Sequence, residues 1–320
     1  MSDVEKQFES IRNNGLLWIN VQRPTSAEIN ILGQRYPFQK LNLDDCLSKI
    51  QIPKIDRYRD HVFIILQFPT PDKEKGFIFS QLAIFMGEDY LVTIHQGDLK
   101  SVEELFNACK NDENQRQITM YKSSGYLLHK IIDGLVDDLF HLLMKVVGNI
   151  DDIEDSVFDE RISIPRQISL LRREITTLRR IIFPLRRTVL DLAKDSQRFS
   201  KDDLTPYFRD VQDHIEKVYE MVEEAKETIE IYKDTDFMLS TEKTNKILSV
   251  LTIVFTLSIP VTVIGTFYGM NINIPGGIVT GPWEQLGRYT TLIFILGLSA
   301  ASALLMVFYF RRLGWMGPSM

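Results

Sequence analysis

The chain has 320 residues, a formal net charge of −6 at pH 7, and 44% hydrophobic and 25% charged residues. The acidic balance and the lack of a basic, aromatic-rich patch argue against nucleic-acid binding. The two cysteines, Cys46 and Cys109, are too few for a disulfide framework or a paired-cysteine metal site, which is typical of a reducing compartment. The chain has no phosphate-binding loop and no hydrolase or dinucleotide-binding motif, so we expect no enzyme.

Residues 1–115 mix predicted strands with helices, which indicates an α/β domain within a cytosolic part of the α+β class. Segments rich in β-branched and aromatic residues predict the strands, and a Gly87-Glu88-Asp89 turn predicts that the last two form a hairpin. The predicted strands are Leu17–Val21, Val62–Phe68, Phe77–Phe85 and Tyr90–His95. A short helix is expected over Glu103–Cys109.

Residues 116–200 form a predicted long-helix region, and 201–246 a predicted stalk helix. Apolar residues at alternating steps of four and three mark one face of each of three helices, which must pack on other helices. Pro184 lies inside the second stripe and should kink that helix. The stripes are Leu128, Ile132, Leu135, Leu139, Leu142 and Val146; Leu171, Ile175, Leu178, Ile182, Leu185, Val189 and Leu192; and Val211, Ile215, Val218, Val222, Ala225, Ile229 and Tyr232.

The third of these helices is predicted to continue into an apolar segment. Thr205 followed by Pro206 is a helix-start signal, a cap and then a first-turn proline. The only later proline before position 270 is Pro260. An unbroken helix from Pro206 to Tyr268 would be ~95 Å long at ~1.5 Å per residue.

Two C-terminal segments, 247–268 and 289–310, contain no charged residue and are 22 residues long each. Each is long enough to cross a hydrocarbon core of ~30 Å as a helix, so we predict two transmembrane helices rather than a buried core helix. Two lysines, at 243 and 246, precede the first segment, and two arginines, at 311 and 312, follow the second. The loop 269–288 between the segments holds only two charged residues, Glu284 and Arg288. By the positive-inside rule both termini, including the tail 311–320, are expected in the cytosol and the loop outside.

The first predicted span has a face that suits a pore. Asn245, Phe255, Ile259 and Thr262 share this face, with Leu248 between them and Leu251 and Thr252 on its flanks. One helix pair has too little surface to enclose a pore, so conduction would require an oligomer, in which apolar rings can gate by dewetting. The alternative is that Ser and Thr bond to their own helix and that Gly265 and Gly269 serve helix packing.

The Gly269-Met270-Asn271 sequence closes the first span. Mg²⁺ prefers oxygen ligands and gives up water reluctantly. A ring of Gly269 carbonyls and Asn271 carboxamides would offer neutral acceptors to a hydrated cation, and Gly269 lets the backbone leave the helix. In isolation a glycine followed by Asn after a helix is also an ordinary C-cap.

This tripeptide between two C-terminal spans resembles the CorA family of divalent metal ion transporters. Further segments look like the family's signatures along nearly the whole chain: Leu43-Asp44-Asp45-Cys46-Leu47, Pro53-Lys54, Leu135-Val136-Asp137-Asp138, Pro184-Leu185-Arg186, Tyr207-Phe208-Arg209-Asp210-Val211-x-Asp213-His214, Thr244-Asn245-Lys246 and Leu251-Thr252-Ile253. The resemblance implies a funnel-shaped homopentamer in the plasma (inner) membrane, with passive influx of Mg²⁺ and, in some members, Co²⁺ or Ni²⁺. It implies no organic cofactor.

The resemblance also implies a regulatory metal site between protomers. Asp210 looks like the family's stalk-helix aspartate, and Asp72 looks like its partner after a strand. A divalent cation would turn the repulsion of two facing carboxylates into a bridge, so we expect internal Mg²⁺ to favour a closed state. The outer loop departs from many relatives, because its first acidic residue is Glu284 and capture of cations at the outer mouth is therefore in doubt.

Two other functions stay open on the sequence. A CorA-like Zn²⁺ transporter is the nearer one, although none of the five histidines, at 61, 95, 129, 141 and 214, lies in a span or in the outer loop. The other is a membrane-anchored coiled-coil sensor without transport. An anchor would need neither polar residues on one face of a span nor the Gly269-Met270-Asn271 sequence.

Overall fold

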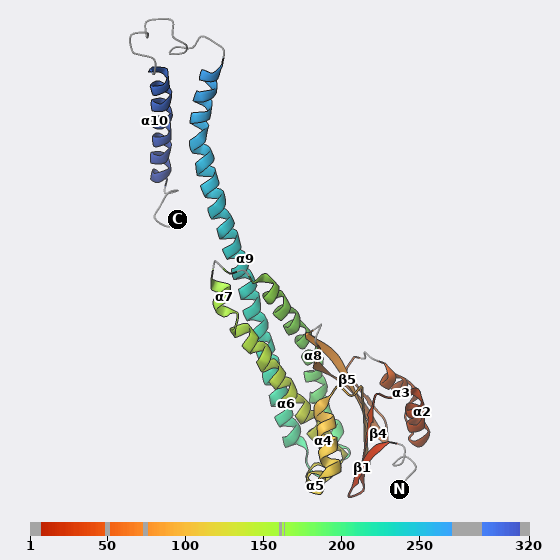
Figure 1. The fold of residues 1–320 in the computed structure, drawn as a ribbon. Helices are drawn as coiled ribbons and strands as arrows, with labels where there is room; N and C mark the ends of the chain where they lie inside the picture. The colour runs from red at the N-terminus through yellow and green to blue at the C-terminus, as the bar shows by residue number, and fades with distance from the viewer. Residues whose placement is uncertain are drawn as a thin grey trace. The chain divides into compact units, whose positions relative to one another are not determined.

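The computed structural model consists of two compact units (Figure 1). In the sequence, the first unit ends at Asp234 and the second begins at Thr235. The first unit contains a mixed sheet with helices, and the second contains the two apolar helical segments. The described residues are 8–48, 52–72, 76–159, 162, 164–270 and 290–313.

A six-stranded sheet with the order β1-β2-β6-β5-β4-β3 forms the centre of the first unit. β2 and β6 are parallel, and the other neighbouring strands are antiparallel. All four predicted strands are present, but β1 and β3 were not predicted. The strands are β1 (Glu9–Asn13), β2 (Leu16–Gln22), β3 (Lys54–Arg57), β4 (His61–Asp72), β5 (Gly76–Gly87) and β6 (Tyr90–His95).

The β1–β2 hairpin turns at Asn14-Gly15. Both residues have positive φ, 46° for Asn14 and 88° for Gly15. Two-residue hairpin turns of this kind match the right-handed twist of the strands, and Asn-Gly is their most favoured sequence. The dipeptide is therefore the local reason why β1 folds back onto β2.

The sheet is covered on both faces, because its strands alternate between two apolar clusters. Phe63 and Ile65 of β4 pack with helices α2 (Ser26–Arg35) and α3 (Lys40–Leu47), whereas Ile64 and Leu66 face the opposite cluster. That opposite cluster holds residues of α4 (Lys100–Asn111), α5 (Glu113–Met120) and the long helices. The predicted helix 103–109 lies within α4, while α2 and α3 were not predicted.

The three long helices are α6 (Ser124–Asp151), α8 (Pro165–Gln197) and α9 (Thr205–Gly269), with a short α7 (Glu154–Phe158) between the first two. Every residue of the three predicted stripes is buried except Leu142, which is half-buried while its neighbour Leu143 is fully buried. The helix-packing prediction is therefore confirmed. α8 continues as one helix through Pro184.

α9 confirms the prediction of one helix that includes both the stalk and the first apolar segment. Its first turn is capped by Asp203, whose carboxylate accepts the backbone N–H of Thr205 at 2.9 Å, so the cap lies two residues before the predicted one. α10 (Thr290–Arg312) is the second apolar helix. Both helices are long and apolar enough to span a membrane. Of the most apolar 18-residue stretch, 0% is buried in the protomer for α9 and 6% for α10.

An ion pair between a half-exposed arginine and a buried aspartate connects α8 to the end of the sheet. Arg57 Nε of β3 lies 2.8 Å from Asp195 Oδ1 of α8, and the side chains are 50% and 4% exposed, respectively. Because removing Arg57 would leave a buried carboxylate unpaired, Arg57→Ala should lower the free energy of unfolding by about 3 kcal/mol. Asp195→Asn leaves a guanidinium that reaches water and should cost only about 1 kcal/mol.

Denaturation of the two purified variants, followed by circular dichroism, checks this asymmetry. Arg57→Ala should unfold clearly before Asp195→Asn, and Asp195→Asn should unfold close to the unmodified chain. Equal losses in the two variants would contradict the burial-based account of this pair.

Candidate functional site

Two carboxylates and an imidazole converge between α6 and α9 in the first unit. One ligand atom from each of Asp133, Asp210 and His214 lies within 4.8 Å of the others. Asp133 is half-buried, and Asp210 and His214 are exposed. Among the described residues this is the one group of three or more His, Cys, Asp or Glu side chains that lie close enough together to hold a metal ion.

Helix geometry explains why these residues meet. Asp210 and His214 are four residues apart on α9, so they share one face, and His214 Nε2 lies 3.9 Å from Asp210 Oδ1. Asp133 follows Ile132 of the α6 stripe, while Val211 follows Asp210 and is buried. The cluster therefore lies at the edge of the packing seam between the two helices.

His129, one turn before Asp133 on α6, has a different role. It is 3% exposed and lies among the rings of Tyr126, Tyr207 and Phe208. Burial lowers the pKa of His129 to about 4; Lys130 also lowers it, and Asp210 opposes the shift. His129 is therefore a neutral packing residue at pH 7, and His214 is the imidazole that solvent and ions can reach.

The donor set of the cluster suits a divalent cation. Carboxylates are the ligands that Mg²⁺ prefers, and an imidazole also suits Co²⁺, Ni²⁺ and Zn²⁺. Asp210 was predicted as a metal ligand, whereas Asp133 and His214 were not. The spacing of Asp210 and His214 was a signal for a shared face, but the approach of Asp133 depends on how α6 packs on α9.

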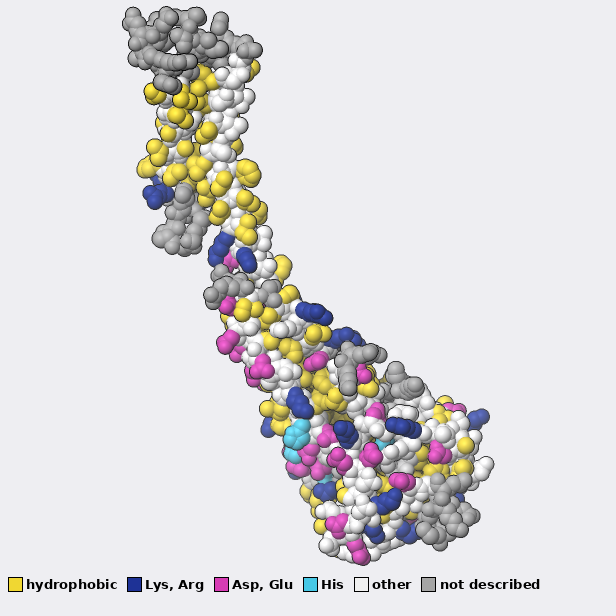
Figure 2. Space-filling view, in the orientation of Figure 1, with side chains coloured by type: hydrophobic (Ala, Val, Ile, Leu, Met, Phe, Trp, Pro, Cys, Tyr) yellow, Lys and Arg dark blue, Asp and Glu magenta, His cyan; other side chains and the backbone are white. Residues whose placement is uncertain are grey.

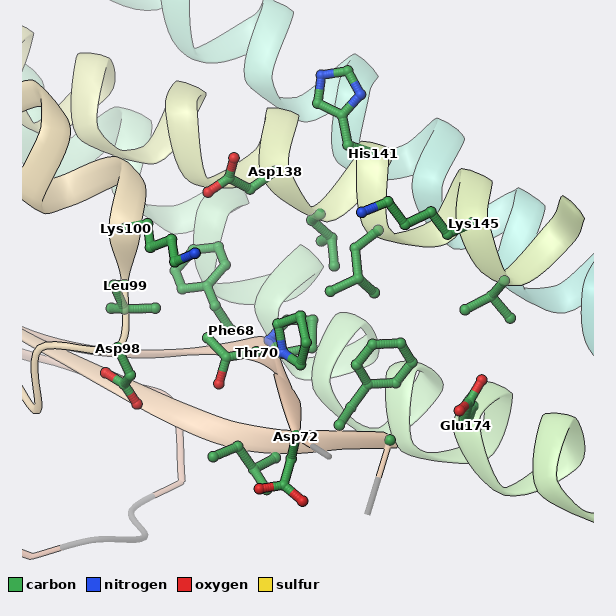
Figure 3. A pocket seen from close by; sticks show the side chains of 18 of the residues that line it. Phe68, Thr70, Asp72, Asp98, Leu99, Lys100, Asp138, His141, Lys145 and Glu174 are labelled. Atoms are coloured by element: carbon green, nitrogen blue, oxygen red, sulfur yellow. The ribbon is translucent and has the colours of Figure 1, made fainter. Parts of the chain in front are cut away.

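Asp72, the other predicted regulatory residue, lies elsewhere in the protomer. It is the last residue of β4, opposite Gly76 of β5. It lines a cleft of about 1090 Å³ between the end of this hairpin and helices α4, α6 and α8 (Figure 3). Asp210 lines a different cavity of about 400 Å³ with Asp203 and Asp213. A contact of Asp72 with Asp210 across protomers therefore stays a prediction.

The predicted pore face belongs to the C-terminal part of α9. Asn245, Leu248, Leu251, Thr252, Phe255, Ile259 and Thr262 are all exposed in the protomer. Residues on the other side of the helix, such as Val254 and Val261, are exposed as well, so exposure alone does not identify the pore face. Figure 2 shows hydrophobic side chains gathered over this part of α9 and over α10. This surface must meet lipid or other copies of the chain.

The threonines of the segment bond back to their own helix. The hydroxyls of Thr252, Thr256, Thr262 and Thr266 each donate to the carbonyl four residues earlier, at 2.7–2.9 Å. This is the arrangement that the alternative reading expected. It does not remove a pore role, because a hydroxyl that donates backward keeps its lone pairs as acceptors. Such acceptors suit the water shell of a cation, whose hydrogens point outward.

Gly269 ends α9, and Met270 follows it with its backbone N–H donating to Phe267 O at 3.3 Å. Met270 is 50% exposed. Asn271, the third residue of the predicted selectivity filter, lies outside the described residues. The role of all three residues in selectivity therefore stays a prediction.

A family model described as a CorA-like Mg²⁺ transporter protein matches residues 13–312. The chain belongs to the CorA family of transporters. This confirms the resemblance seen in the motifs. The cobalt/magnesium transport protein CorA of Thermotoga maritima is 28% identical over 320 residues, which cover 98% of this chain and 88% of that protein.

Solved structures show the same fold. The complete CorA magnesium transporter of Methanocaldococcus jannaschii matches with a TM-score of 0.78 and 21% identity, over 96% of this chain and 93% of that one. The cytoplasmic domain of ZntB from Vibrio parahaemolyticus matches with a TM-score of 0.59 and 16% identity, over 72% and 90%. At these identities the likeness concerns the fold alone.

Proposed function

We propose that this CorA-family transporter is a homopentameric channel for passive influx of hydrated Mg²⁺, with Co²⁺ and Ni²⁺ as further substrates. The observation that carries the proposal is α9, one helix whose apolar segment ends at Gly269-Met270 and lies unburied in the protomer. The membership of the family and the cobalt/magnesium transport named for the Thermotoga maritima relative support the choice of ion.

Assembly around a symmetry axis would turn the pore face of α9 into stacked rings. Asn245 would form a polar ring at the cytosolic mouth, Phe255 and Ile259 apolar rings, and Thr262 a ring of acceptors below the Gly269-Met270-Asn271 filter. We place the protein in the plasma (inner) membrane with both termini in the cytosol. Arg311 and Arg312 at the end of α10 support this orientation, since basic residues stay on the cytosolic side.

Cytosolic Mg²⁺ would regulate the channel through Asp210. This residue belongs to the Asp133–Asp210–His214 cluster within a protomer, and we propose that it also faces Asp72 of a neighbouring protomer. A cation bound to either set would hold α9 at its cytosolic end. Because α9 continues into the membrane segment, this restraint would reach the pore.

Limited proteolysis of the full chain separates the two regulatory contacts. Mg²⁺ should slow trypsin cleavage of the unmodified protein, because bound ligand stabilises the closed form. Asp210→Asn should abolish this protection, since Asp210 belongs to both sets. Asp133→Asn tests only the cluster within the protomer, and Asp72→Asn only the pairing between protomers.

Asp213→Asn is the matched control for this experiment. Asp213 lies on α9 and lines the same 400 Å³ cavity as Asp210, but it is not part of the cluster. It should keep full protection by Mg²⁺. Unchanged protection in Asp210→Asn and in the Asp72/Asp210 double variant would refute regulation through these carboxylates.

Zn²⁺ transport is the second candidate function, because His214 adds a nitrogen ligand to the cytosolic cluster. Uptake measured with Zn²⁺ in place of Mg²⁺ tests it directly. A membrane-anchored sensor without transport is the third, and it predicts binding of Mg²⁺ in the cytosolic unit with no flux of any of these ions.

A further inference from the structure

Just before its membrane segment, α9 carries exposed apolar side chains at a height where the chain should lie in water. Phe237 and Met238 are 72% and 63% exposed, respectively, within the stretch 233–246, in which six residues are charged. The first predicted span begins at Ile247, so Met238 lies ~13 Å before it along the helix, beyond the headgroup layer. Lipid therefore cannot cover Met238, and only another copy of the chain is available to do so.

Met238 continues the spacing of the predicted pore face toward the cytosol. It lies seven residues before Asn245, and further steps of seven lead to Thr252 and Ile259. Positions seven residues apart stay on one face of helices that coil around each other. α9 is one helix through all these positions, without a proline between Met238 and Ile259. Met238 therefore lies on the pore face of the same helix.

The face between Met238 and Asn245 carries no charge. Thr241 occupies the intermediate position, is exposed, and donates its hydroxyl hydrogen backward to its own helix at 2.8 Å. Glu242 flanks the face, and its Oε1 lies 3.2 Å from Lys246 Nζ, one turn further along α9. The side chain that begins this face on the cytosolic side is therefore the thioether of Met238.

We propose that the Met238 side chains of all protomers meet around the symmetry axis and form an apolar collar at the cytosolic end of the ion path. The collar requires the homopentameric channel proposed above, and it extends the path two turns of α9 beyond the Asn245 ring. Methionine suits such a collar, because its side chain is apolar, unbranched and flexible. A narrow apolar ring resists wetting, so hydrated Mg²⁺ would pass it only when the copies of α9 separate.

Disulfide cross-linking of the full-length protein in detergent tests whether Met238 faces its copies. A disulfide needs Cα atoms about 4.4–6.8 Å apart, which only a narrow collar provides. Oxidation of Met238→Cys with copper phenanthroline should therefore yield covalent dimers on a non-reducing gel. Phe237→Cys is the matched control, since one residue turns the helix by about 100° and places this thiol on another face. It should yield no dimers above those of the unmodified chain.

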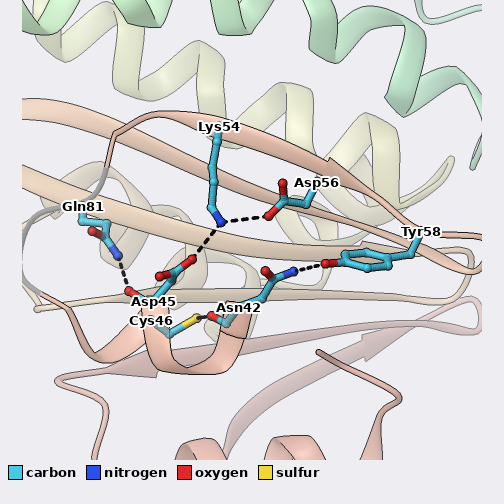
Figure 4. Close-up of polar contacts among 7 residues, drawn as sticks. All are labelled: Asn42, Asp45, Cys46, Lys54, Asp56, Tyr58 and Gln81. Carbon is cyan, nitrogen blue, oxygen red and sulfur yellow. Dashed lines mark hydrogen bonds and ion pairs between the residues drawn. The ribbon is translucent and has the colours of Figure 1, made fainter. Parts of the chain in front are cut away.

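The two native cysteines give a low background in this experiment. Cys46 is 3% exposed, and its thiol donates to the carbonyl of Asn42 at 3.1 Å (Figure 4). Cys109 is fully buried in α4. Burial raises the pKa of both thiols, and the thiolate is the form that reacts. Dimers in Met238→Cys can therefore be assigned to the introduced thiol.

Mg²⁺ uptake into liposomes tests whether ions pass the collar. Met238→Lys places one ammonium group per protomer in the path, and a narrow ring of like charges repels a divalent cation. Uptake should therefore fall about tenfold or more. Phe237→Lys adds the same number of charges on another face of α9 and should leave uptake within about twofold of the unmodified chain.

The collar and the channel fail in different ways. Uptake by the unmodified protein, with no dimers in Met238→Cys or with full uptake in Met238→Lys, would overturn the collar and leave the channel standing. Equal dimer formation in Phe237→Cys would also overturn it, because the copies of α9 would then meet without a preferred face. No uptake by the unmodified protein would instead refute the proposed channel, and the collar as a barrier to ions with it.

Discussion

Asn271→Ala should abolish Mg²⁺ uptake into liposomes that contain the purified protein. In the proposed filter, each protomer contributes one Asn271 carboxamide that accepts hydrogen bonds from the water shell of the ion. Alanine removes this acceptor from every protomer at once, and the hydrated ion loses the whole ring. An ion-sensitive dye inside the vesicles would report uptake no greater than the leak of vesicles without protein.

Asn273→Ala is the matched control, because it makes the same chemical change two residues further along the same loop. A substitution outside the filter should leave uptake within about twofold of the unmodified chain. Loss of uptake in both variants would point to a damaged loop rather than to a filter at Asn271. Full uptake in Asn271→Ala would contradict the assignment of Asn271 to the selectivity filter.

Ile259→Asn should increase Mg²⁺ entry, in contrast to Asn271→Ala, which should abolish it. The increase should be clearest when internal Mg²⁺ is high and the channel is expected to be closed. Ile259 contributes an apolar ring to the proposed pore, and apolar constrictions resist wetting. A polar ring would hold water and lower the barrier. An increase of about tenfold requires only about 1.4 kcal/mol.

Val261→Asn is the control for Ile259. The two residues are exposed to a similar extent, 55% and 49%, and lie at nearly the same depth. At about 100° per residue they point to nearly opposite sides of α9, so Val261→Asn changes polarity outside the pore face. Equal gains in the two variants would indicate general damage to the membrane segment. A gain confined to Val261→Asn would place the pore on the other face.

The long helices were the most predictable part of this fold. Their apolar stripes repeat over many turns, and only one helical face can bury them, so burial of residues such as Ile215 and Leu178 follows from spacing alone. The lack of any proline between Pro206 and Pro260 predicted an unbroken helix over that range, and α9 then continues through Pro260 to Gly269. Regular patterns over long segments leave few alternative structures.

The short elements of the α/β domain were harder to predict. β3 has four residues and α3 has eight, too few for a clear period. α2 did carry a local signal, because Thr25 and Glu28 form a capping box in which each side chain accepts the backbone N–H of the other residue. The parallel pairing of β2 with β6 joins strands that are far apart in sequence, and no local pattern reports such a contact.

The candidate metal cluster could likewise be predicted only in part from the sequence. Asp210 and His214 share a helical face by spacing, so their proximity could be inferred. Asp133 comes from another helix, and its approach depends on how side chains of α6 and α9 interlock. The pairing between Asp72 and Asp210 depends further on how protomers assemble, which one chain does not determine.

Uptake by the unmodified protein tests the central claim most directly. Purified chain in liposomes with low internal Mg²⁺ and an inside-negative potential provides a driving force of about 2.3 kcal/mol per charge per 100 mV. A pentameric Mg²⁺ channel predicts rapid entry of Mg²⁺ that grows with the imposed potential. No entry above that of protein-free vesicles would contradict the channel, and entry of Zn²⁺ alone would replace Mg²⁺ with Zn²⁺ as the substrate.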